Sequence, residues 1–206
     1  MEITRRRRLL ETLAALLTAV GKIVFINLLE IRTPYIVLTI LGWGTYIFFR
    51  FRQRPQVLSY WGLTTTGFWK SFGQLLPVVL VCSGVFFAYG YYYDTQVVDW
   101  TLVLILLLYP IWGILQHFLL LGIFGRNLQD GGLATGWVIA LTSVLFAVIH
   151  YPSPWLIGAT FFLAIVYTWL YLRGHNLLVL GIYHGWLGGV FFYTVLGRNP
   201  WLEAFG

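Results

Sequence analysis

The feature that most constrains this chain is a succession of long apolar runs, each close to the length that crosses a bilayer. An α-helix rises about 1.5 Å per residue, so roughly 20 apolar residues cover the hydrocarbon core. Composition agrees, because 59% of the 206 residues are hydrophobic and only 10% are charged. The pattern therefore predicts an all-α integral membrane protein with about seven transmembrane helices, and it excludes a soluble globular domain.

The expected spans follow from the boundaries of the runs. They cover residues 9–29, 35–49, 72–92, 100–124, 134–150, 155–172 and 177–196. No small-residue cleavage site follows the first run, so we expect it to be a retained span rather than a signal peptide. Lys22 within that run indicates that one side faces protein or that the side chain snorkels. In the polar stretch 50–70, the aromatic part 60–70 is expected to lie in the headgroup region.

The cations predict the orientation. With a cytoplasmic N-terminus, most of the 13 Lys and Arg residues fall on the cytoplasmic side, namely Arg5, Arg6, Arg7, Arg8, Arg50, Arg52, Arg54, Lys70, Arg126 and Arg173. These charges flank apolar runs, so we expect no nucleic-acid surface. The single cysteine, Cys82, excludes an internal disulfide. Compact loops favour a bacterial inner membrane or an organellar-type membrane.

Four polar side chains inside the later runs are the candidates for function. Gln116 and His117 are adjacent in the fourth run, His150 ends the fifth, and His184 lies in the seventh. Polar groups inside a membrane span usually face the protein interior and mark functional sites. His175, in a loop beside Arg173, is interpreted as a solvated turn residue.

Two small-residue features position these side chains. Gly181, Gly185 and Gly189 form a small-xxx-small ridge on the seventh run, which allows another helix to approach closely. His184 is adjacent to this ridge and is expected to point into the bundle. Pro110 removes a backbone donor, and a kink is expected just before Gln116.

These residues resemble the CPBP family of intramembrane proteases, which includes type II CAAX-prenyl endopeptidases and bacteriocin-processing proteins. The family's Phe-x-x-x-His motif is intact as Phe146 to His150. Its His-x-x-x-Asn/Asp motif keeps His184 but has Gly188 at the last position. Its glutamate pair with a spaced arginine and glycine is altered most, to Gln116-His117, Leu121 and Gly122.

The resemblance also implies a division of the chain. Residues 100–206 would form the CPBP-like core bundle, and residues 1–99 would form the N-terminal spans with the interfacial segment.

The resemblance implies a site in which the family's first glutamate activates water and two histidines assist. Gln116, His150 and His184 are therefore the candidate catalytic residues. A glutamine amide cannot accept a proton as a base, and losing a general base costs roughly 10²- to 10⁴-fold in rate. We therefore interpret the chain as catalytically degenerate and as a binding, assembly or regulatory factor. His117 and Leu121 are interpreted as a neutral replacement for a buried ion pair. An active endopeptidase with a modified Gln/His site is the alternative, and whether the chain is an enzyme stays open.

Other interpretations of the same residues remain open. His117, His150 and His184 from three helices can hold a divalent metal such as zinc, and two of them can ligate a tetrapyrrole. Each histidine can equally pack without any chemical role. Phe146, Trp112 and Trp186 are candidate lining for a prenyl tail or pigment, or they are simply core. The expected partners are membrane lipids and another membrane protein or a prenylated, lipid-like ligand.

One geometric difficulty accompanies the predicted convergence of these histidines. If the fifth span starts at the cytoplasmic surface, His150 lies near its outer end, on the order of 15 Å from the level of His117 and His184. Convergence then requires tilted helices or a fifth span that starts below the membrane surface.

Overall fold

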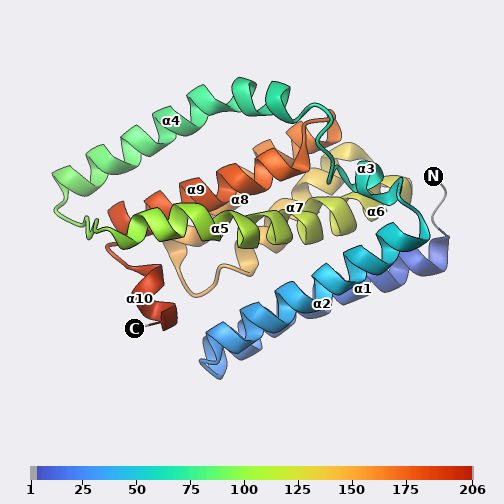
Figure 1. Cartoon of the computed structure of the whole chain (residues 1–206), viewed down its shortest axis with the longest axis horizontal. Coiled ribbons are helices and arrows are strands. Elements are labelled where there is room, and N and C mark those ends of the chain that lie inside the picture. The colour runs from blue at the N-terminus through green and yellow to red at the C-terminus, as the bar shows by residue number, and fades with distance from the viewer. Residues whose placement is uncertain (1–3, 206) are drawn as a thin grey trace. The chain divides into compact units, whose positions relative to one another are not determined.

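The computed structural model describes residues 4–205, and within that range the chain is helical without a β-strand. In chain order the helices are α1 (Arg5–Gly21), η1 (Lys22–Leu28), α2 (Arg32–Gln53), α3 (Val57–Trp61), α4 (Phe68–Tyr92), α5 (Thr101–His117), η2 (Phe118–Gly125), α6 (Arg126–Asp130), α7 (Thr135–Val148), α8 (Pro154–Leu172), α9 (Leu177–Thr194) and α10 (Pro200–Phe205). The two η segments are π-helices. The predicted all-α membrane architecture is confirmed (Figure 1).

Six helical stretches in the described part of the chain are long and apolar enough to cross a membrane, and the fifth predicted span is shorter than expected. In place of 134–150 the structure has α7, with 14 residues. That length gives a rise of about 21 Å against a hydrocarbon core of about 30 Å. The helix ends at Val148 because the chain turns over residues 149–153 before Pro154 starts α8.

The chain divides into two compact units, which are described one at a time. The first contains residues 4–64 and 117–177, and the second contains residues 65–116 and 178–205. The boundary between the two units that lies inside the fourth apolar run therefore falls between Gln116 and His117. The predicted division into 1–99 and 100–206 rests on the family resemblance and stays a prediction.

In the first unit, α1 and α2 run side by side (Figure 1). The Trp43 indole N–H donates to the Thr18 hydroxyl at 3.1 Å, and the Tyr35 hydroxyl donates to the Thr18 carbonyl. Within the same unit, α7 packs on α8 through a hydroxyl pair, Thr142 and Thr168, whose oxygens are 2.8 Å apart and fully buried. Interhelical hydrogen bonds of this kind hold membrane helices together where lipid is as apolar as the side chains.

The segment expected at the headgroups is partly internal. Trp61 at the end of α3 is fully buried, with its ring 5.1 Å from that of Phe118. Gly62 follows it with φ +80°, a backbone conformation that side chains rarely adopt, and a Cβ there would lie 3.2 Å from Leu177. This turn therefore directs the indole into the first unit, and the headgroup depth of segment 60–70 stays a prediction.

Next to that turn, Tyr60 anchors the short helix. Its hydroxyl donates to the Asp130 carboxylate, and the Arg126 guanidinium donates to the Tyr60 carbonyl at 3.1 Å. Burial, reinforced by the bond to Asp130, raises the pKa of Tyr60 well above its usual range. The phenol therefore stays protonated and keeps its donor role at any physiological pH.

In the second unit, α5 and α9 approach at backbone distance. A Cβ on Gly181 would lie 2.4 Å from the Ile114 Cα, and one on Gly185 would lie 2.7 Å from the Pro110 Cα. Real Cβ atoms do not come so close to backbone, so glycine is required on this ridge. The prediction that the ridge admits a neighbouring helix is confirmed.

Candidate functional site

Gln116 and His117 lie where the helix geometry changes. The α-helix α5 continues through Pro110 to His117, and η2 begins at the next residue. Single-turn π segments interrupting α-helices are frequent at functional sites. The change from α to π geometry follows Gln116 and His117, whereas a bend before Gln116 stays a prediction.

In the second unit, the structure pairs Gln116 with His184. The Gln116 Oε1 atom and the His184 Nε2 atom are 3.1 Å apart, and His184 is 7% exposed. With this amide orientation the imidazole N–H donates to the amide oxygen; with the amide reversed, its NH₂ donates to the ring nitrogen. Either way the imidazole has a neutral amide as its neighbour, and that amide cannot act as a base.

In the first unit, His150 is fixed by its own helix. Its Nδ1 atom lies 2.6 Å from the Phe146 carbonyl oxygen. A carbonyl only accepts, so Nδ1 carries the proton and Nε2 of the neutral ring keeps its lone pair. The Phe-x-x-x-His spacing therefore has a direct structural use, because the last turn of α7 orients the ring.

His117 is fully buried between aromatic rings from two other helices. Its ring centroid lies 5.3 Å from that of Phe146 on α7 and 5.2 Å from that of Tyr167 on α8. The Phe146 ring is in turn 4.8 Å from the His150 ring. Phe146 thus contacts both imidazoles of this unit.

The predicted site is therefore seen as two parts. The first unit groups His117, Phe146 and His150, and the second joins Gln116 to His184. Convergence of all four side chains on one pocket stays a prediction.

Sequence reasoning missed a polar contact beside His150. Lys22 donates to the Tyr151 carbonyl at 3.3 Å, and the Asn27 amide donates to the same oxygen at 2.5 Å. Both donors come from the π-helix η1. The available signal was the occurrence of Lys22 and Asn27 five positions apart in the second half of the first predicted span.

Zinc in proteins is held by three or four His, Cys or carboxylate ligands. Within residues 4–205 no group of three such side chains is placed to share an ion. The metal site of His117, His150 and His184 stays a prediction. The tetrapyrrole interpretation stays a prediction.

The remaining candidates have packing roles that the sequence did not specify. The Trp186 indole donates to the Leu106 carbonyl at 2.9 Å within the second unit. Trp112 is half-buried, and its assignment to a ligand cavity stays a prediction, as does that of Phe146 and Trp186. His175 is not simply solvated, since its Nδ1 donates to the Leu170 carbonyl at 3.1 Å and caps the end of α8.

Comparison with known proteins adds one finding. Residues 98–190 match the family model described as "Type II CAAX prenyl endopeptidase Rce1-like", and the matched segment contains Gln116, His117, His150 and His184. No curated protein and no solved structure matches the chain.

Proposed function

Residues 98–190 belong to the CPBP family of Rce1-like membrane proteins, and from this premise we propose that the chain is a catalytically degenerate member. It binds, escorts or regulates a membrane protein or a prenylated, lipid-like ligand, and it does not hydrolyse a peptide bond.

The observation that supports this proposal is the pairing of Gln116 with His184. Where the family resemblance expects a water-activating glutamate, this chain has an amide whose oxygen lies 3.1 Å from the imidazole. An amide orients a neighbour through hydrogen bonds but does not remove a proton from water. Gln116 is therefore suited to orienting His184 and to holding two helices in register, and it cannot itself serve as the general base.

The neighbouring exchange supports the same interpretation. His117 and Leu121 occupy the positions of the second glutamate and the arginine, and both are fully buried. A buried charge left without its partner destabilises a fold by several kcal/mol. Replacing both charged groups by a neutral imidazole and an alkyl side chain avoids that cost, so the altered motif is compatible with a stable fold without activity.

One observation favours the second candidate, an active endopeptidase with a modified site. The bond from Nδ1 of His150 to the Phe146 carbonyl leaves Nε2 with a lone pair, and a neutral imidazole is a competent general base near pH 7. In this alternative His150 takes over the proton transfer that Gln116 cannot perform.

The test uses the full chain in proteoliposomes and a farnesylated CAAX peptide bearing a fluorophore and a quencher. We expect the wild-type chain to bind the farnesylated peptide, to bind its unprenylated form at least tenfold more weakly, and to release no fluorescence above protein-free liposomes. Gln116→Glu restores the carboxylate, and Gln116→Leu is the control that removes polarity without adding a base.

Two outcomes contradict the proposal. Cleavage by the wild-type chain that disappears in His150→Ala and persists in the control His175→Ala establishes the active endopeptidase instead. Equal binding of prenylated and unprenylated peptide removes the lipid-like ligand from the proposal.

A further inference from the structure

We propose that the cavity between α1 and α2 is a binding site for an anionic phospholipid, with the phosphate at the arginine-rich end and part of one acyl chain against Trp43. This site involves none of the four histidine and glutamine positions discussed above, and it does not depend on the proposed function.

The cavity is an open pocket between side chains of two adjacent helices. It has a volume of about 290 Å³ and is lined by Arg7, Leu10, Glu11, Ala14, Trp43 and Tyr46. That volume is at the lower end of the range for small-ligand pockets. The cavity therefore fits a portion of a lipid rather than a whole drug-sized molecule.

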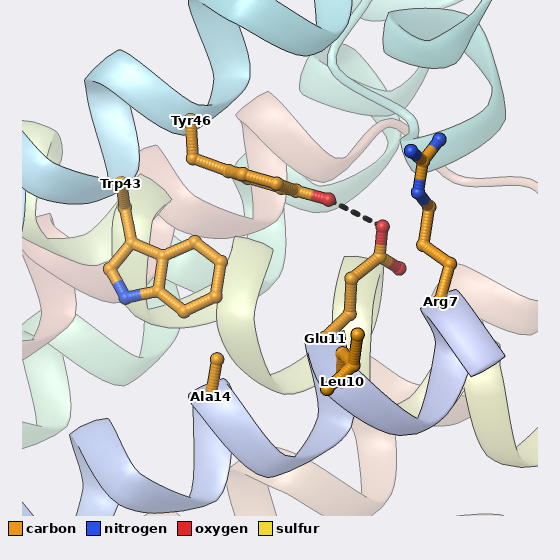
Figure 2. Close-up of a pocket in the computed structure, with 6 residues that line it drawn as sticks. All are labelled: Arg7, Leu10, Glu11, Ala14, Trp43 and Tyr46. Atoms are coloured by element: carbon orange, nitrogen blue, oxygen red, sulfur yellow. Dashed lines mark hydrogen bonds between the residues drawn. The ribbon is translucent and has the colours of Figure 1, made fainter.

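The two ends of the cavity differ in chemistry. Figure 2 shows Trp43 and Ala14 at one end, and the charged groups of Arg7 and Glu11 with the Tyr46 hydroxyl at the other. An apolar wall that leads to a charged end matches an amphiphile, whose tail and headgroup make different contacts.

The carboxylate at the polar end already has its donors. Glu11 is 5% exposed. The Tyr46 hydroxyl donates to its Oε1 at 2.5 Å, and the Asn127 amide donates to its Oε2 at 3.3 Å. Glu11 is thus an internal structural group and does not require a cation from a ligand.

One arginine lines the polar end of the cavity. Arg7 is exposed and extends toward that end (Figure 2). Arg50 lies outside the lining, is 4% exposed, and has its Nε 3.9 Å from the Glu11 carboxylate. Glu11 thus has a cation of its own beside it, and a phosphate supplies several acceptors and a negative charge to the Arg7 guanidinium.

The positive charge at the adjoining ends of α1 and α2 favours a lipid with an anionic headgroup. The first turns of α1, the last turns of α2 and the residue after α2 carry seven arginines against one acid, Glu11. The arginines are Arg5, Arg6, Arg7, Arg8, Arg50, Arg52 and Arg54. Basic groups at the end of membrane helices attract anionic lipids, at about 1 kcal/mol for each cation near the surface. A zwitterionic lipid lacks the net charge that this end of the cavity complements.

The experiment measures quenching of Trp43 by lipids with brominated acyl chains. The purified full chain in detergent is titrated with brominated phosphatidylglycerol and, separately, with brominated phosphatidylcholine. The difference between wild type and Trp43→Phe isolates the contribution of Trp43. We expect saturable quenching by phosphatidylglycerol and at least fivefold weaker quenching by phosphatidylcholine.

Two pairs of variants test the two ends. Arg7→Gln raises the half-saturating concentration of phosphatidylglycerol about fivefold, whereas the control Arg6→Gln, one position along the same helix and outside the cavity lining, changes it less than twofold. Ala14→Phe fills the apolar end and abolishes the saturable component. Its control is Leu13→Phe, which adds the same ring at an adjacent position that is 53% exposed.

Each contrary result has a defined meaning. Equal quenching by the two lipids, or equal effects of Arg7→Gln and Arg6→Gln, overturns the selective site. Displacement of the lipid by millimolar inorganic phosphate assigns the arginine end to free phosphate instead. A melting temperature of each variant within a few degrees of wild type separates loss of the site from loss of folding.

Discussion

Phe146 is the side chain on which the histidines of the first unit depend. It is fully buried, and its ring lies 5.3 Å from that of His117 and 4.8 Å from that of His150. Its carbonyl also accepts the hydrogen bond that fixes the His150 ring. In sequence it is one phenylalanine among 16, and only the motif spacing distinguished it from the others.

Phe146→Ala is expected to destabilise the chain by about 3–5 kcal/mol, because it leaves a cavity between two imidazoles that cannot collapse. The measurement is reversible unfolding in mixed micelles. Phe162→Ala, at a position that is 68% exposed, is the control and is expected to lose less than 1 kcal/mol. Comparable losses for the two variants would show that Phe146 does not hold this packing.

Lys22 is a second residue with a specific structural task. Its ammonium group donates to the Tyr151 carbonyl, next to His150, and to the Asn27 amide oxygen at 3.4 Å. A cation in an apolar run is expected to have a defined partner. The sequence indicated that Lys22 either faces protein or snorkels, but it gave no means of identifying a carbonyl 129 residues away.

Lys22→Met keeps a side chain of similar length and removes the donor. We expect amide hydrogen exchange at residues 149–153 to accelerate about fivefold, equivalent to the loss of one hydrogen bond of ~1 kcal/mol. Mass-spectrometric exchange measures it, with the exposed Lys70→Met as control. Unchanged exchange at this loop would rule out the assigned role of Lys22.

At the scale of elements, the second unit is organised by backbone contact between α5 and α9. A Cβ on Gly113 would lie 2.4 Å from the Gly181 carbonyl oxygen, so the close approach is reciprocal. This contact brings the two helices near enough for Gln116 to reach His184. The glycine spacing predicted the contact surface of α9, whereas the partner helix was decided by the tertiary fold.

Gly181→Ala is therefore expected to be strongly destabilising, by about 2–3 kcal/mol or more, since its Cβ would overlap the backbone of Ile114. Gly188→Ala on the same helix is the matched control, because its nearest neighbour is the Tyr109 ring at 3.4 Å. It is expected to be neutral or slightly stabilising, as alanine is the better helix former. Thermal unfolding of the purified variants distinguishes them; equal effects would refute the close approach.

At the scale of the whole molecule, the apolar runs and the cations predict how the chain crosses the membrane. The described residues contain six stretches of spanning length and the shorter α7. Since the cations flank the first helices asymmetrically, the positive-inside rule predicts a cytoplasmic N-terminus.

This orientation is tested with single cysteines in a Cys82→Ser background. Gln53→Cys follows the second span, and Gln96→Cys lies between the third and fourth; both positions are exposed. A membrane-impermeant maleimide is expected to label Gln96→Cys in intact cells and Gln53→Cys only after permeabilisation. The reverse pattern would place the N-terminus outside.

The sequence alone determined the class of the molecule, most span boundaries, the similarity of residues 98–190 to a known family and the chemical identity of the candidate side chains. These properties are local. In lipid each helix satisfies its own backbone hydrogen bonds, so hydropathy and the ends of the runs suffice to locate it.

Only the tertiary structure decided which side chains meet. It shortened α7, buried Trp61, paired Gln116 with His184, and directed Lys22 and Asn27 to the Tyr151 carbonyl. The hydrogen bonds among these join residues more than 60 positions apart, and they depend on how side chains fill the space between helices. That filling is a property of the whole packed unit, because neighbouring apolar runs present nearly equivalent surfaces until they are in contact.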